Sequence, residues 1–112
     1  MQDDTEPGLI ARSIDGNSEA YAELVNRYKN AVYYHCFAIV RDEDVAEDVA
    51  QETFISAYYS LKRYDNKYRL ATWLFKIGTN KCLNHLKRKG KEIVADDKLL
   101  ATIASQGTTP HV

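Results

Sequence analysis

The sequence of 112 residues contains few residues that would break or cross-link a helical chain. Its two prolines, Pro7 and Pro110, lie near the ends, so none of the residues between them prevents long helices. The two cysteines, Cys36 and Cys82, are too few for a disulfide scaffold and favour a reduced, cytoplasmic chain. No apolar run approaches the ~20 residues of a membrane span. Because the acidic N-terminus also lacks the apolar stretch of a secretory signal, we expect a cytoplasmic protein without membrane insertion.

Motifs for catalysis and for metal binding are missing as well. The sequence has no Ser/His/Asp or Cys/His arrangement, no glycine-rich phosphate loop and no paired carboxylates in an apolar setting. His35, Cys36, Cys82 and His85 are possible zinc ligands, but no CxxC spacing occurs and both cysteines fall on apolar helix arcs. We expect no enzyme activity, no cofactor and no metal site.

The spacing of apolar residues predicts an all-α fold, a compact bundle of about four helices. We expect helices over residues 7–14, from a cap at Asn17 or Ser18 to residue 39, over 44–63, and from a cap at Thr72 to residue 89. Asp44 and Glu47 have the spacing of a capping box for the third helix. Gly78, inside the fourth helix, is about 1 kcal/mol less favourable there than alanine, which indicates close packing.

Charge is strongly segregated although the net charge is only −1. Residues 1–56 carry four Lys/Arg against twelve Asp/Glu, a formal charge of −8. Residues 57–91 carry ten Lys/Arg against the single Asp65, a formal charge of +9, and residues 92–112 carry −2. A basic segment of this density is typical of a nucleic-acid binder, and the acidic half indicates a second, basic partner. The alternative is that the two halves neutralise each other within the fold.

The third predicted helix has two distinct faces. Its core arc is expected to hold Ala50, Phe54, Ala57, Tyr58 and Leu61. A second arc places two apolar side chains in an acidic surround, as in a partner-binding patch: Asp48, Gln51, Glu52, Ile55 and Tyr59. The alternative is that Ile55 and Tyr59 pack under a neighbouring element.

The fourth predicted helix combines an apolar arc, Phe75, Cys82, Leu83 and Leu86, with a line of mixed chemistry. That line consists of Trp73, Lys76, Asn80, Asn84 and Lys87. Cations suit phosphates, amides suit base edges and an indole can stack on an unpaired base. The preceding loop adds basic and aromatic residues together: Arg63, Tyr64, Lys67, Tyr68 and Arg69. This combination predicts binding of a single strand, although Trp73 alone could equally be a core tryptophan.

The segments DVAEDVAQETFISAYYSLKRY and TWLFKIGTNKCLNHLKRK together resemble region two of bacterial RNA polymerase sigma factors of the extracytoplasmic-function (ECF) group. The resemblance covers about residues 9–91. It implies a helical domain that binds the clamp coiled-coil of RNA polymerase and recognises the promoter minus-ten element as single-stranded non-template DNA. It also implies an anti-sigma factor as a partner and an association with the nucleoid through the polymerase.

The resemblance assigns roles to the two groups of residues. The arc of Asp48, Gln51, Glu52, Ile55 and Tyr59 would face the polymerase. Tyr64 and the loop through Ala71 would hold a base flipped out of the strand. Asn80 would read that strand, and the phosphates would be contacted by Lys76, Lys87 and Arg88.

The resemblance also sets expected domain boundaries. Residues 1–91 would form the region-two domain and residues 92–112 a linker or disordered tail. A minus-35-reading helix-turn-helix domain is expected to be absent, because the 21 residues after Lys91 are too few for it. The competing hypothesis is a sigma-like protein–protein module that binds a regulator and does not recognise DNA.

Overall fold

The computed structural model describes residues 3–90, which form four α-helices and one short 3-10 turn. The helices are α1 (Glu6–Ile14), α2 (Ser18–Val40), α3 (Glu43–Ser60) and α4 (Leu70–Gly90), and the turn η1 (Leu61–Arg63) directly follows α3. No strand occurs within residues 3–90, so the predicted all-α bundle of about four helices is confirmed. Lys91 and the predicted tail, residues 92–112, lie outside the described residues.

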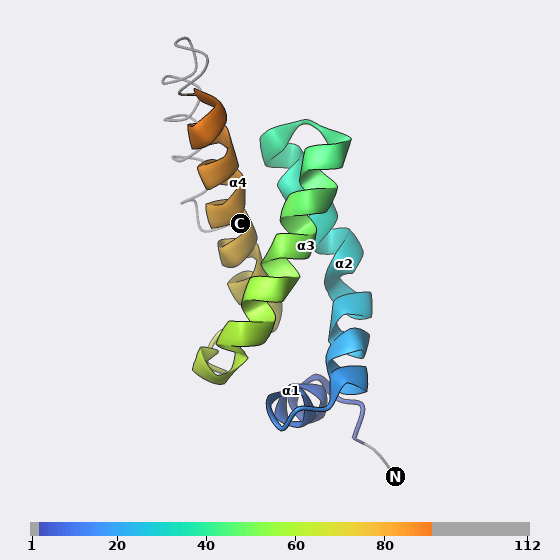
Figure 1. Ribbon diagram of the computed structural model, residues 1–112. Helices are drawn as coiled ribbons and strands as arrows, with labels where there is room; N and C mark the ends of the chain where they lie inside the picture. The colour runs from blue at the N-terminus through green and yellow to red at the C-terminus, as the bar shows by residue number, and fades with distance from the viewer. Residues whose placement is uncertain (1–2, 91–112) are drawn as a thin grey trace.

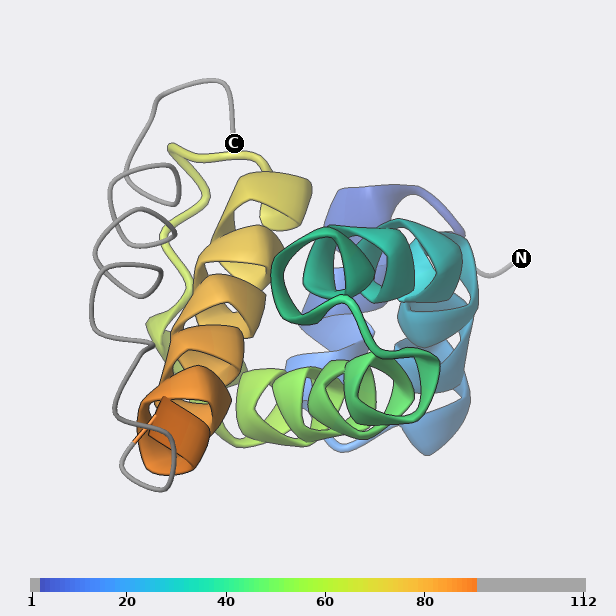
Figure 2. The same ribbon diagram turned by 90° about the horizontal axis from the view of Figure 1, so that it is seen from above.

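Helix α2 is the centre of the arrangement, because it contacts α1, α3 and α4. Helices α2 and α3 run in opposite directions and α4 packs against both, while α1 lies across the end where α2 begins (Figure 1). Seen from above, α4 lies on one side of the bundle, with α2 and α3 next to each other on the other side (Figure 2). This packing leaves one face of α3 and one face of α4 uncovered by the other described helices.

The turn between α2 and α3 differs in detail from the prediction. Arg41 adopts a left-handed conformation (φ 59°) that ends α2, and the side chain of Asp42 caps α3 by accepting a hydrogen bond from the backbone N–H of Val45 at 3.0 Å. The predicted capping box at Asp44 and Glu47 is therefore wrong. The reversal needs only two residues, so the cap lies two positions earlier than the acidic pattern indicated.

Helix α4 also begins earlier than predicted, at Leu70 and not after a cap at Thr72. Leu70 is only 2% exposed, and the backbone N–H of Trp73 bonds to the carbonyl of Arg69 at 3.2 Å. Burial of the Leu70 side chain in the core stabilises this extra turn, which the polar residues around it had concealed. The loop before α4 is correspondingly short, spanning residues 64–69.

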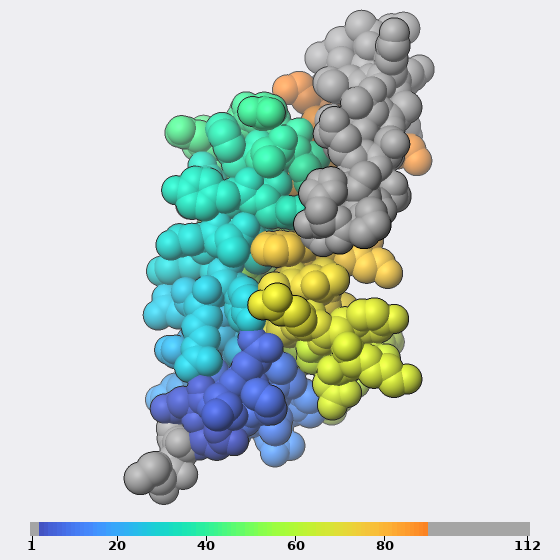
Figure 3. Space-filling model, turned by 180° about the vertical axis from the view of Figure 1, so that it is seen from behind, coloured from blue at the N-terminus to red at the C-terminus, as the bar shows by residue number. Residues whose placement is uncertain are grey.

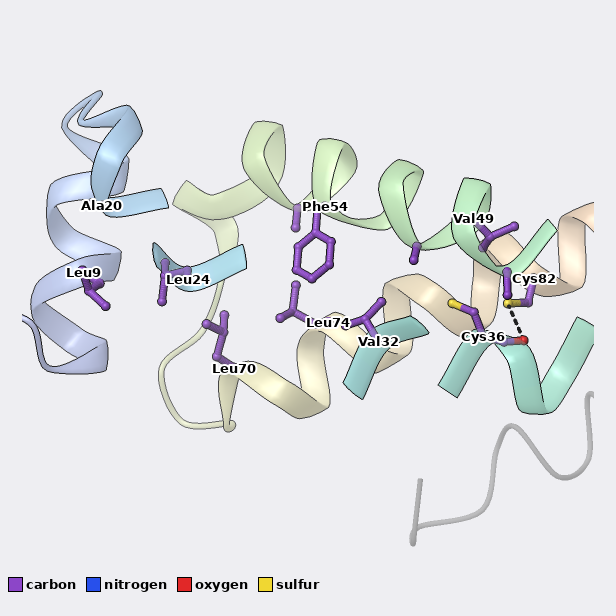
Figure 4. Packing of buried hydrophobic residues seen from close by; sticks show 13 residues of the cluster. Leu9, Ala20, Leu24, Val32, Cys36, Val49, Phe54, Leu70, Leu74 and Cys82 are labelled. Carbon is purple, nitrogen blue, oxygen red and sulfur yellow. Dashed lines mark hydrogen bonds between the residues drawn. The ribbon is translucent and has the colours of Figure 1, made fainter. Parts of the chain in front are cut away.

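The core runs along the bundle between α2, α3 and α4 (Figure 4). Leu70, Leu74 and Cys82 form the buried side of α4, whereas the predicted arc is only partly correct because Phe75, Leu83 and Leu86 are half-buried. Periodicity fixes the angles between side chains but not which arc meets the neighbouring helices. Gly78 lies at the crossing: a Cβ there would be 3.5 Å from Cys36 Sγ and 3.5 Å from Thr53 Oγ1, which confirms close packing.

Within residues 3–90, no helix combines the length and apolar character needed to cross a bilayer. In the same part of the chain, no group of three or more His, Cys, Asp or Glu side chains is placed to hold a metal ion. Cys36 and Cys82 are free thiols in the core, and the hydrogen bond with Cys36, together with burial, raises the pKa of Cys82 well above its usual range.

Candidate nucleic-acid and protein interfaces

The acidic arc of α3 lies on the surface. All five of its predicted members are exposed, and its two apolar side chains, Ile55 and Tyr59, are 59% and 81% exposed. The alternative in which these two side chains pack under a neighbouring element is therefore wrong for the described chain. An apolar anchor inside an acidic rim is thus a real surface feature, which we call the α3 face (Asp48, Gln51, Glu52, Ile55 and Tyr59).

Tyr58 lies beside the α3 face. The prediction from the sequence, which placed Tyr58 in the core, is wrong. It is 41% exposed, and its ring centroid lies 5.0 Å from that of Tyr21 and 5.4 Å from that of Tyr59. With Phe54 and Ile55, these tyrosines line a shallow hollow of about 260 Å³. Tyr58 lies at the edge of the core arc, where Tyr21 of α2 covers only part of its ring. Helical periodicity alone cannot locate that edge.

The predicted line of mixed chemistry lies on α4, and we call it the α4 stripe (Trp73, Lys76, Asn80, Asn84 and Lys87). Its polar members are also exposed. Lys76, Asn80, Asn84 and Lys87 all reach solvent, as does Arg88. They lie away from the buried side of α4, which faces α2 and α3. The predicted separation of a core side and an outward polar line is therefore present in the fold.

Trp73, the first member of the α4 stripe, is half-buried and packs against the core. Its ring centroid lies 5.2 Å from that of Tyr64, with the ring planes tilted by 48°. The question of core or surface therefore has a mixed answer, because one part of the indole contacts the core and another remains open to solvent. The pair also joins the loop to the start of the α4 stripe.

The loop over residues 64–69 has a defined shape built around Asp65. The Oδ1 atom of Asp65 accepts from the N–H of Lys67 at 3.0 Å, and its carbonyl accepts from the N–H of Tyr68 at 3.1 Å. The hydroxyl of Tyr64 donates to the carbonyl of Tyr68. Burial first, and then the carboxylates of Glu6 and Asp65, raise the pKa of Tyr64, which keeps this hydroxyl a donor. The predicted basic and aromatic side chains around this frame are exposed, except Tyr64, which is half-buried: Arg63, Lys67, Tyr68 and Arg69.

The loop and α1 enclose a pocket of about 680 Å³ that the sequence did not reveal. Its α1 side includes Glu6, Ile10 and Ile14, and its loop side includes Tyr64 and Tyr68. Seen from behind, the atoms of α1 lie beside those of the loop (Figure 3). The pocket joins residues fifty or more positions apart in the sequence, and no local pattern signals it.

Comparison with known proteins identifies the family. The Sigma-70 region 2 family matches residues 24–92. The ECF RNA polymerase sigma factor SigW of Bacillus subtilis (strain 168) is 32% identical over 87 residues, which are 78% of this chain and 46% of SigW. The ECF RNA polymerase sigma-E factor of Haemophilus influenzae is 34% identical over 98 residues, 83% of this chain and 51% of the relative. The chain thus spans about half the length of the curated relatives it matches.

Two solved structures share the fold. One is an engineered region 2 of sigmaE in complex with GTAAAA, with a TM-score of 0.72 and 34% identity, covering 80% of this chain and 93% of the other. The other is CnrH in complex with the cytosolic domain of CnrY, with a TM-score of 0.61 and 32% identity, covering 87% and 60%. The helical fold, the matched residues and these relatives agree, and the chain belongs to the Sigma-70 region 2 family as a region-two domain of the ECF sigma factors.

Proposed function

We propose that this domain binds the clamp coiled-coil of RNA polymerase and captures the non-template strand of a promoter minus-ten element as single-stranded DNA. The observation that carries the DNA part is the exposed α4 stripe, which continues through the Trp73–Tyr64 ring contact into a basic, aromatic loop. Stacking platforms beside cations suit an unpaired strand. The relative solved in complex with GTAAAA supports this proposal.

Within this proposal, the amide, basic and aromatic side chains each have a separate role in binding DNA. The amide of Asn80 reads a base edge, and Asn84 lies one turn further along the same exposed line. Lys76, Lys87 and Arg88 contact phosphates, and Arg63, Lys67 and Arg69 extend that positive surface around the loop. The rings of Tyr64, Tyr68 and Trp73 give the bases apolar contacts.

The α3 face is the proposed polymerase contact. Its exposed Ile55 and Tyr59 supply an apolar anchor, while Asp48 and Glu52 meet basic residues of the clamp. The protein would then act in the cytoplasm, where the polymerase brings it to the nucleoid. It would catalyse no reaction of its own. Its chemistry would be limited to binding.

Oligonucleotide binding tests the DNA part. We expect weak, sequence-selective affinity for single-stranded minus-ten-like DNA that falls steeply as salt rises, because cations displace counterions from phosphates. Asn80→Ala should reduce selectivity between sequences, whereas Lys87→Ala should weaken all sequences alike. Binding that responds to neither sequence nor salt would refute DNA recognition.

That refutation would leave a second function, a protein–protein module that binds a regulator. The structure of CnrH in complex with the cytosolic domain of CnrY favours keeping it, because CnrH shares this fold at 32% identity. An anti-sigma factor is the expected partner in either case. Only the first function predicts oligonucleotide selectivity, so the same experiment separates the two.

A further inference from the structure

Helix α1 provides one wall of the 680 Å³ pocket, opposite the loop. Ile10 and Ile14 give this wall an apolar surface, and Ile14 is 36% exposed. The facing side carries Tyr68, which is 63% exposed. An apolar surface opposite an aromatic ring suits a planar ligand that inserts between them.

The polar chemistry of the pocket is unevenly distributed. Glu6, on the α1 side, accepts a hydrogen bond from the hydroxyl of Tyr28 through Oε1. Burial and this bond raise the pKa of Tyr28 to about 12, so the phenol remains a donor and holds the carboxylate in place. The second carboxylate oxygen, Oε2, has no hydrogen-bond partner among the described residues. A fixed acceptor is thus available at the apolar wall.

The cations of the pocket lie on the loop side. Lys67 and Arg69 belong to the loop, and both side chains are exposed. The loop carboxylate that also lines the pocket, Asp65, accepts a hydrogen bond from the N–H of Lys67, so the two cations outnumber it on this side. A nucleotide bound here would keep its phosphates near these cations and point its base toward α1. The opposite orientation would bring phosphate to the carboxylate of Glu6, where like charges repel.

We infer that α1 is the second wall of the base pocket and that Glu6 selects the base, favouring adenine or cytosine over thymine. Adenine and cytosine present an exocyclic amine from which a carboxylate can accept a hydrogen bond, whereas the one donor of thymine, its ring N–H, lies between two carbonyl oxygens that repel a carboxylate. Tyr28 is a positioning residue that orients Glu6. The inference rests on the proposed single-strand recognition and adds its selectivity determinant.

An oligonucleotide scan tests the assignment. Each position of GTAAAA is replaced in turn by the other bases, and affinity is measured by NMR titration of the domain and of Glu6→Gln. Glutamine can still accept from Tyr28 but also presents an N–H₂ that pairs with a thymine carbonyl. At one position, wild type should prefer adenine or cytosine over thymine by about tenfold, and Glu6→Gln should remove that preference. The methyl signals of Ile10 should shift on binding.

Asp15→Asn is the matched control, because it removes the same charge from an exposed residue at the other end of α1, outside the pocket. It should keep the wild-type preference at every position. The assignment is overturned if Glu6→Gln keeps the wild-type preference throughout, or if it changes all affinities equally. A wild-type domain that binds all sequences alike would instead refute the proposed DNA recognition, and this inference with it.

Discussion

The Nε2 atom of His35 on α2 lies 2.7 Å from the Oγ1 atom of Thr79 on α4. The same imidazole stacks on Phe75, with ring centroids 4.7 Å apart and planes inclined by 21°. Thr79 is buried and His35 half-buried, so this polar contact connects α2 to α4 next to the Gly78 crossing. Helix α4, which we propose to bind DNA, therefore contacts the bundle through a titratable side chain, that of His35.

Protonation of His35 should weaken the bundle. Burial lowers the pKa of His35, and a hydrogen bond with the backbone of Phe75 only partly opposes the effect. The unfolded chain, with an ordinary histidine pKa of ~6.5, then binds the proton more readily than the folded chain. Stability should therefore fall as pH drops from 7.5 through the unfolded-state pKa toward the folded-state pKa. Urea unfolding followed by circular dichroism at pH 7.5, 6.5 and 5.5 measures this.

His35→Gln isolates the effect, because glutamine keeps a polar partner for Thr79 and does not titrate. The pH dependence should shrink in this variant and persist in His85→Gln, which changes the histidine of α4. Equal pH slopes for wild type and His35→Gln would show that other groups control acid sensitivity.

Gly78→Ala should stabilise the protein. The added methyl would make ordinary contacts with Cys36 and Thr53 at 3.5 Å, and alanine is about 1 kcal/mol more favourable than glycine in a helix. For a domain of this size, we expect the midpoint of thermal unfolding to rise by roughly 4–8 °C. Gly78→Val is the control, because its two further methyl groups should overpack the crossing and lower stability by about 1–3 kcal/mol. A destabilised alanine variant would mean that the helices cross more closely.

Asp42→Ala should destabilise the fold by about 1 kcal/mol, because it removes the side chain that caps α3. Asp44→Ala removes an acid of the same type from the first turn of α3, where its charge acts on the helix dipole and does not cap the helix. It should therefore lower the free energy of unfolding by only a few tenths of a kcal/mol, which is the lower end of the range for charges that interact with a helix dipole. Chemical denaturation of both variants decides between the two cap positions, and a larger loss at Asp44 would contradict the observed cap.

The periodicity of apolar residues was sufficient to predict the helices, the exposure of the α3 face and the outward position of the polar side chains of the α4 stripe. It failed where neighbouring helices decide the outcome. Tyr58 lies on the predicted core arc but at its edge, and Leu70 lies in a polar stretch but is buried because α4 packs there against the bundle. Glu6 could not be assigned at all, since its pocket forms only when α1 and the loop meet across the fold.

Ile55→Asp should abolish binding to RNA polymerase core without unfolding the domain. Ile55 is 59% exposed, so aspartate at this position buries no charge, and the helical melting transition should remain. In the polymerase complex, however, the aspartate would replace the apolar anchor, and its carboxylate would lose its water without gaining a partner. We expect this to cost several kcal/mol of binding free energy and to lower the affinity at least a hundredfold. Tyr34→Asp is the matched control, because Tyr34 is 66% exposed on α2, outside the α3 face, and should bind as wild type. Equal binding by both variants, measured by pull-down and fluorescence anisotropy with core enzyme, would remove the α3 face from the polymerase contact.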